Sequence, residues 1–186
     1  MPGNAFILFK NSDGTISTGS SMQSTHPSSA GWLEITDWNW DIEAETNFLK
    51  GTGASVGVAT PGTFGFSHSF DRSSPNIMNY IVLGTAFKSV VLHMLKSTGA
   101  ADGAPEVFFG FKIADAFITK VSSKAGEDGA ITQDVEFVFK AIALGYKQQL
   151  NTGKLDATIR PFGWNVATKT TTAGFVVALD PKKDLS

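Results

Sequence analysis

Hydrophobic and polar residues alternate along three long segments of the second half of the chain, residues 87–96, 106–121 and 131–146. Short stretches rich in glycine separate these segments, and no spacer between them is long enough to hold a helix. Segments of this kind pair as consecutive antiparallel strands. The pattern therefore predicts a mainly β fold, a compact antiparallel β-barrel made of two packed sheets.

One short α-helix is predicted just before the first of these strands, over residues 74–83. Ser74 stands at the N-cap position, Pro75 at the first helical position, and Gly84 follows the last apolar residue. A hydroxyl cap, an N-terminal proline and a closing glycine are the signals that bound a helix. The helix is expected to flank the barrel.

The length of 186 residues predicts a single domain over residues 1–186, large enough for one core. Residues 11–30 and 51–65 are rich in Ser, Thr and Gly, but each is flanked by strand-like segments. We therefore expect surface loops within one fold rather than linkers between domains.

Composition removes several classes of function. The chain has no cysteine, which excludes disulfides, thiolate nucleophiles and Cys-ligated metals. It contains 15 Lys and Arg and 17 Asp and Glu, and it has no run of basic residues that would indicate a nucleic-acid partner. The first ten residues do not resemble a secretory signal, and no apolar window is long enough to span a membrane. We expect synthesis in the cytoplasm and, if the protein is secreted, export without a cleavable signal peptide.

The segment Gly53–Gly57 matches the G-x-S-x-G pattern of hydrolases, in which a strained strand-to-helix turn exposes the nucleophilic serine. The residues after it, V-A-T-P-G-T-F, predict no helix, so a chance match in a loop is the favoured interpretation. A secreted monomeric hydrolase or effector that uses Ser55 remains the alternative from a different functional class.

The other chemically capable residues form no convincing site. His26, His68 and His93 are dispersed, without metal-ligand spacing, and are interpreted as structural or surface histidines. Alternation places Asp41, Glu43 and Glu45 on one polar face, which is expected to be solvated rather than catalytic. No catalytic, cofactor-binding or metal-binding residue is predicted.

The segment 32–42 changes phase in its apolar alternation. Leu33 and Ile35 fall on one face, whereas Trp38, Trp40 and Ile42 fall on the other. A β-bulge near residues 36–37 would bring both sets to the core, and this interpretation is favoured. The alternative is that the tryptophans bury themselves in a neighbouring subunit.

The order of several short motifs resembles the Hcp family, the tube subunits of bacterial type VI secretion systems. The resemblance spans about residues 4–147, and the order of its pieces is more specific than any one of them. Its most telling pieces are D71-R-S-S-P75 and E136-F-V-F-K-A-I142 followed by Tyr146. The pieces that precede these are F6-x-L-F-K, D13-G-T-I-S-T-G-S20, His26, W32-L-E-I35 and W38-N-W40.

The resemblance implies a non-enzymatic subunit that forms homohexameric rings, which stack into a tube propelled by a contracting sheath. Its implied partners are sheath, baseplate and spike components and effector cargo carried in the lumen, with neither nucleic acid nor membrane insertion. A tube protein of another contractile injection system, similar to phage tail tubes, is an alternative of the same mechanical kind. Apolar residues on both faces of residues 135–144 agree with oligomerisation.

The resemblance also suggests contact residues. In Hcp-like proteins an extended loop reaches neighbouring subunits, and the matching stretch is at about residues 43–64; there Phe48 and Leu49 could instead fold back on their own barrel. The chain is longer than a typical family member, with a surplus at about 168–186 that could dock on the ring exterior, cap a ring face or remain a mobile tail. The expected subunit contacts are Phe48, Leu49, Trp38, Trp40, Phe175 and Val177.

Overall fold

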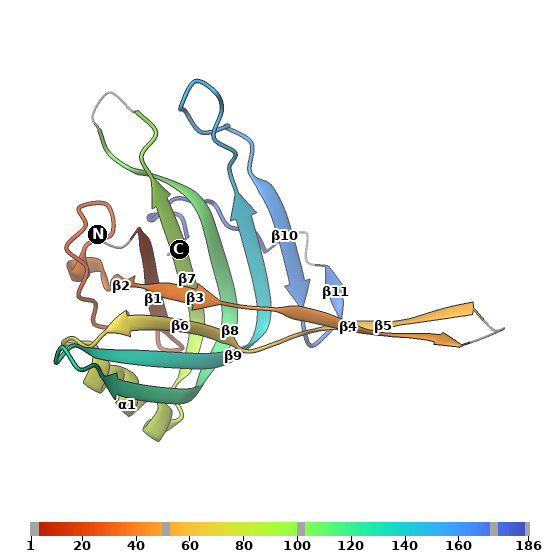
Figure 1. Cartoon of the computed structure of the whole chain (residues 1–186), viewed down its shortest axis with the longest axis horizontal. Helices are drawn as coiled ribbons and strands as arrows, with labels where there is room; N and C mark the ends of the chain where they lie inside the picture. Colours follow the sequence, from red (N-terminus) through yellow and green to blue (C-terminus); the bar gives the residue numbers. More distant parts are fainter. Residues whose placement is uncertain (1–3, 50–52, 100–102, 172–174, 185–186) are drawn as a thin grey trace.

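The computed structural model describes residues 4–49, 53–99, 103–171 and 175–184. These residues form a mainly β fold with one α-helix (Figure 1). The strands are β1 (Ala5–Asn11), β2 (Leu33–Ile35), β3 (Asp37–Asn39), β4 (Ile42–Leu49), β5 (Gly53–Pro61), β6 (Phe64–Ser69), β7 (Ala86–Lys96), β8 (Glu106–Ala125), β9 (Ile131–Tyr146), β10 (Arg160–Asn165) and β11 (Thr170–Thr171). The helices are α1 (Ser74–Leu83) and a 3-10 turn, η1 (Ser28–Ala30).

The three long strands expected from the alternation are confirmed as β7, β8 and β9, and each pairs with the next in an antiparallel ladder. Strand β9 belongs to both layers of the fold. Its first half pairs with β6 and its second half pairs with β10. One layer follows the strand order β11-β10-β9-β8-β7-β1-β2. The other layer is formed by β3 and β6 together with the first half of β9, with which β6 pairs.

A bend at Thr36 joins the two layers. Strand β2 pairs with β1, whereas β3, directly after the bend, pairs with β6. The Thr36 N–H leaves the first ladder and donates to the Ser67 carbonyl at 2.8 Å. Among the described strands, ladders connect β2 to β1, and then β7, β8, β9, β6 and β3 in turn. The bend at Thr36 joins β3 back to β2 along the chain, and the barrel closes there through this covalent link rather than through a ladder. The irregularity expected near residues 36–37 is located here.

The helix has the bounds that the sequence predicts, but its N-cap is Ser73 rather than Ser74. Ser74 is the first helical residue, and its hydroxyl accepts the N–H of Asp71 at 3.0 Å. Gly84 closes the helix in the left-handed conformation, with φ of 62°. The helix packs beside β8 at one end of the barrel (Figure 1).

Two motifs of the sequence contact each other at the helix entry. The Asp71 carboxylate accepts hydrogen bonds from the Ser20 hydroxyl and from the Ser73 N–H. Arg72 Nε donates to the Gly19 carbonyl at 2.8 Å. The long segment before β2 is thereby tied to the start of α1.

The core has two parts, one inside the barrel and one outside it. The inner part is rich in aromatic residues from β1, β6, β7, β8 and β9, including the fully buried Phe9, Phe64, Phe111 and Phe137. The outer part lies on the opposite face of β1, β7 and β9 and includes Phe6, Leu8, Trp32 and Val91. A sheet that is apolar on both faces needs cover on both faces.

Candidate functional site

Strands β4 and β5 form a hairpin that projects from the body of the molecule (Figure 1). We call this hairpin the arm. Its strands pair from Ile42↔Pro61 to Leu49↔Gly53, with a register shift after Ala44. The stretch expected to be an extended loop at about 43–64 is therefore largely a β-hairpin. Beyond their mutual pairing, β4 and β5 make no substantial contact with any other described element.

Both faces of the arm's base are exposed. The carboxylates Asp41, Glu43 and Glu45 are exposed, which confirms the solvated polar face that the alternation predicts. Ile42 and Ala44 on the opposite face are also exposed, Ile42 by 41%. Ile42 therefore does not join the core with the two tryptophans, because the strand has already left the barrel at that point.

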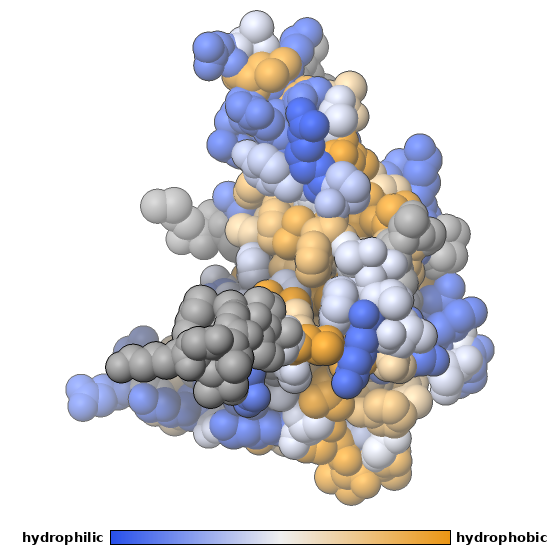
Figure 2. Space-filling view, turned by 90° about the vertical axis from the view of Figure 1, so that its right-hand side faces the viewer, coloured by the Kyte–Doolittle hydropathy of each residue, from blue (hydrophilic) through white to orange (hydrophobic). Residues whose placement is uncertain are grey.

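Apolar side chains remain exposed where the arm leaves the barrel. Val58 on the arm is 53% exposed, and Phe162 on β10 is 38% exposed. Figure 2 shows apolar residues on the face from which the arm projects. Apolar surface at a projecting element is typical of a contact with another chain.

Phe48 and Leu49 lie in β4, where they pair with Ala54 and Gly53 of β5. Their side chains lie outside the described part of the structure, so their role as subunit contacts stays a prediction. Ser55 lies opposite Asn47 in the same hairpin. The strand-to-helix turn of a hydrolase nucleophile is therefore replaced by a strand-to-strand pairing around Ser55.

Trp38 packs in the inner core of its own chain. Its ring is stacked between Phe64 and Phe109, at centroid distances of 5.9 and 5.5 Å. Its indole N–H donates to the Met94 sulfur at 3.3 Å. The bend at Thr36 turns this side chain inwards, which agrees with the favoured interpretation of the phase change.

Trp40 is half-buried against the same inner core, edge-on to Phe111 and tilted against Phe139. Its own chain thus covers part of the ring, and the exposed Phe162 covers another part at 6.3 Å. A contact of Trp40 with a second subunit stays a prediction that concerns only its remaining surface.

The C-terminal residues 175–184, which we call the strap, lie on the outer core. Val177 and Leu179 are 3% and 5% exposed and pack with Phe6, Leu8 and Val91. The strap thus docks on its own barrel, and its expected placement relative to a ring, on the exterior or on a ring face, stays a prediction. Val177 is buried within its own chain and has no surface left for a subunit contact, whereas Phe175 is half-buried.

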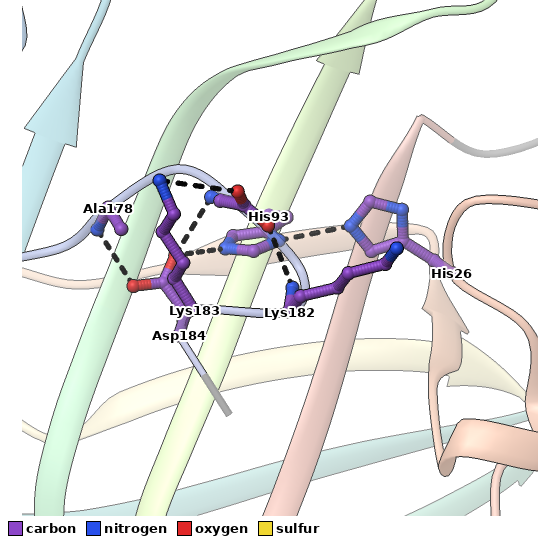
Figure 3. Close-up of polar contacts among 7 residues, drawn as sticks. His26, His93, Ala178, Lys182, Lys183 and Asp184 are labelled. Carbon is purple, nitrogen blue, oxygen red and sulfur yellow. Dashed lines mark hydrogen bonds and ion pairs between the residues drawn. The ribbon is translucent and has the colours of Figure 1, made fainter. Parts of the chain in front are cut away.

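A buried chain of side chains anchors the strap to the barrel (Figure 3). His93 on β7 contacts Asp184 of the strap, with Nε2 and Oδ2 3.0 Å apart. Its other ring nitrogen, Nδ1, lies 3.0 Å from Nε2 of His26, which comes from the segment before β2. His26 Nδ1 in turn lies 3.0 Å from the Thr25 hydroxyl. We call this chain the histidine relay.

The relay is sealed from solvent. His26 and His93 are 0% exposed and Asp184 is 2% exposed. Trp32 lies against both imidazoles, with centroid distances of 4.5 Å to His26 and 5.1 Å to His93. The expected dispersed histidines thus include one buried pair. His68 is buried elsewhere, with Nε2 2.9 Å from Gln133 Oε1.

Burial sets the protonation of the relay. Loss of hydration, with a smaller contribution from the neighbouring His93, lowers the pKa of His26 from 6.5 to about 3. Burial acts to raise the pKa of Asp184, but hydrogen bonds from His93 and from the N–H groups of Ala178 and Asp180 outweigh it and hold that pKa below its ordinary value. Asp184 is therefore ionised and His26 is neutral at pH 7.

The described residues contain no group of three His, Asp or Glu side chains that could hold a metal ion. A cavity of about 320 Å³ adjoins the relay and is lined by Thr25, His26, Glu106, Lys147 and residues of the strap. No helix within the described ranges is long and apolar enough to cross a membrane.

Comparison with known families gives one match. The family described as "Type VI secretion system effector, Hcp" matches residues 9–146. The strap and Asp184 lie beyond this range. Comparison with curated proteins found no match.

Solved structures share the fold. A structure described as a type six secretion system protein is 20% identical, with a TM-score of 0.76 over 90% of this chain and 99% of the other. Hcp1 from Salmonella typhimurium is 24% identical, with a TM-score of 0.68 over 92% and 100% of the chains. A type VI secretion system effector from Yersinia pestis is 21% identical, with a TM-score of 0.64 over 87% and 99%. The likeness in fold therefore extends beyond residues 9–146.

Proposed function

The chain belongs to the Hcp family of type VI secretion tube subunits, and we propose that its copies close into hexameric rings that stack into the tube. The family is one of structural proteins that are secreted as components of this machine.

One observation carries the proposal: the arm has exposed faces at its base and no substantial contact with the rest of its own chain. An isolated two-stranded hairpin is marginally stable in water and needs a third strand or an apolar cover. A neighbouring copy would supply that cover. The contact would be heterologous, since the arm of one copy meets a different surface of the next, and a heterologous contact that closes by rotation generates a ring.

Exposed strand edges support the same conclusion. The strand order β11-β10-β9-β8-β7-β1-β2 ends at β11. This strand has two residues, which pair with Trp164 and Asn165 of β10. Arg160, Pro161 and Phe162 of β10 thus pair with β9 on one side, without a named strand on the other side within the described residues. Unpaired edges promote association between chains, and a ring contact that covers this edge would remove the hazard.

The proposed role fixes the kind of partners. A stacked tube would meet a second ring at each face, the contractile sheath on its outside, and the baseplate and spike at its ends. Effector cargo would occupy the lumen. In this role the protein acts by shape and assembly, and no turnover of a substrate is part of it.

Removal of the arm tests the proposal. Residues 45–58 would be replaced by Asn-Gly, which joins the paired residues Ala44 and Ala59 through a two-residue turn. We expect the far-UV circular dichroism of a folded β protein and a monomeric mass. The matched control changes Glu127→Asn and Asp128→Gly in the exposed turn between β8 and β9, and should keep the ring. Rings that persist without the arm would refute its role.

A further inference from the structure

The strap is held by two kinds of contact, and only one of them can respond to pH. Val177 and Leu179 supply apolar burial on the outer core. Asp184 supplies the polar anchor: its carboxylate accepts the N–H of Ala178 at 2.7 Å, the N–H of Asp180 at 3.2 Å and the His93 ring at 3.0 Å. The carboxylate thus folds the strap on itself and fastens it to β7.

The relay has a fixed direction when both imidazoles are neutral. His93 Nε2–H donates to the ionised Asp184, so its Nδ1 must be an acceptor. His26 Nε2–H then donates to that Nδ1, and His26 Nδ1 accepts the Thr25 hydroxyl. Every ring nitrogen has a partner. The ionised Asp184 determines which nitrogen of His93 carries the proton, and His93 in turn determines it for His26.

The same geometry limits how many protons the pair can take. One proton on His93 can be accommodated, because His26 can reverse its direction and accept at Nε2. A proton on each ring cannot be accommodated, because two N–H groups and two positive charges would then face each other across 3.0 Å. The closed strap therefore excludes the doubly protonated pair.

The groups around the relay do not relieve this restriction. Among the described charged residues, those lining the adjacent cavities are Glu106 on β8, Lys147 after β9, and Asp180, Lys182 and Lys183 of the strap. Glu106 accepts a hydrogen bond from Thr98, and Asp180 accepts the N–H of Lys182. Of the carboxylates that the structure describes, Asp184 is the one for which a contact with the pair is found, and it is already shared by three donors.

We propose that the His26–His93 pair is a proton-operated latch for the strap: it holds residues 175–184 on the barrel at neutral pH and releases them as the solution is acidified. The open strap lets solvent reach the pair, and both rings can then be protonated. Release also uncovers the outer core around Phe6, Leu8 and Val91. The latch lies within one chain and does not depend on the proposed ring.

The low pKa of His26 in the closed state sets the size of the effect. Opening returns this pKa from about 3 towards 6.5. The closed state disfavours the protonated form of His26. The closed strap is therefore most stable relative to the open strap above pH 6.5, and it loses that stability as the pH falls below 6.5. The ratio of closed to open strap should fall by up to about thirtyfold between pH 7.5 and pH 5.

Hydrogen exchange read by mass spectrometry tests the latch in the full-length chain. The readout is the protection factor of peptides covering residues 175–184, corrected for the intrinsic pH dependence of exchange. We expect protection to fall by about thirtyfold from pH 7.5 to pH 5, while peptides from β7 and β8 keep their protection. Unchanged protection of the strap over this range would overturn the proposal without any variant.

Three variants assign the effect to the relay. His26→Gln keeps a donor towards His93 but cannot be protonated, so the strap should stay protected and its pH dependence should vanish. Asp184→Asn weakens the anchor and should lower protection at every pH. Asp180→Asn, the matched control in the same segment, should retain the thirtyfold change. A His26→Gln profile that matches that of the wild type would also overturn the proposal.

Discussion

Gly110 on β8 and Gly145 on β9 lie directly opposite each other, and together they form the seat of the strap. A Cβ atom on Gly110 would lie 3.0 Å from the Leu179 side chain, and one on Gly145 would lie 3.3 Å from that of Val177. The missing side chains therefore leave the depression that the strap fills. The seat holds the strap through apolar contacts, and the relay holds the same segment through hydrogen bonds.

Filling the seat should displace the strap. Gly145→Val places a branched side chain where Val177 and Leu179 pack, and overpacking of this kind costs about 1–3 kcal/mol. We expect lower hydrogen-exchange protection of residues 175–184 and a lower midpoint of chemical unfolding. Gly145→Ala is the graded control, because a single Cβ meets neighbours at 3.2 to 3.4 Å, and it should have a smaller effect. Full protection in the valine variant would contradict the seat.

The stability of the whole fold should depend on pH through His26. Its pKa is about 3 in the folded chain and near 6.5 once unfolded. Unfolding therefore takes up a proton below pH 6.5, and folding stability is lost as the pH falls from there, by up to about 1.4 kcal/mol per pH unit. Urea unfolding at pH 7.5, 6 and 5 measures this slope. His26→Gln should flatten it, and an equal slope in that variant would contradict the assignment.

Trp38→Ala should destabilise the monomer, because the ring is stacked between Phe64 and Phe109. Removal of a large aromatic side chain from a core costs about 3–5 kcal/mol, and the half-buried position of Trp38 suggests the lower end. Trp38→Phe keeps an aromatic ring in the stack and loses the N–H to Met94 and part of the ring volume, so it should cost less than Trp38→Ala. If Trp38→Ala changed oligomeric mass but not unfolding free energy, the interface interpretation would hold instead.

Ser55→Ala should be silent. Ser55 is part of the arm's β-pairing and not of a nucleophile turn, and we expect removal of its hydroxyl to change stability by less than about 0.5 kcal/mol. Unfolding and oligomeric mass should match the wild type. If the purified wild-type protein had a hydrolytic activity and Ser55→Ala lost it, the enzyme alternative would be supported instead.

Local signals in the sequence account for the barrel. Strands β7, β8 and β9 and helix α1 agree with their predicted ranges to within a few residues, since alternation, turn glycines and the Pro75 and Gly84 boundary residues act over short distances. The phase change before Trp38 was informative as well, because a strand must bend at Thr36 if both of its apolar sets are to be buried.

The arm and the histidine relay could not be predicted from local signals, and the relay depends on contacts between residues that are distant in the sequence. The arm alternates too weakly to be distinguished from a loop, since its described faces are both exposed. His93 is 67 residues from His26 and 91 from Asp184, so no local spacing connects them. One signal was available: Val91, His93 and Leu95 share a strand face that is apolar apart from the histidine. An apolar outer face requires a cover, and a histidine on it requires a polar partner.

The mass of the wild-type protein in solution tests the central claim most directly. Size-exclusion chromatography with light scattering, followed by negative-stain imaging of the same fraction, should give six times the chain mass of 19.8 kDa and ring-shaped particles. A monomer across a wide range of concentrations would contradict the account, because the arm would then be stable without the neighbouring copy that its exposed faces require.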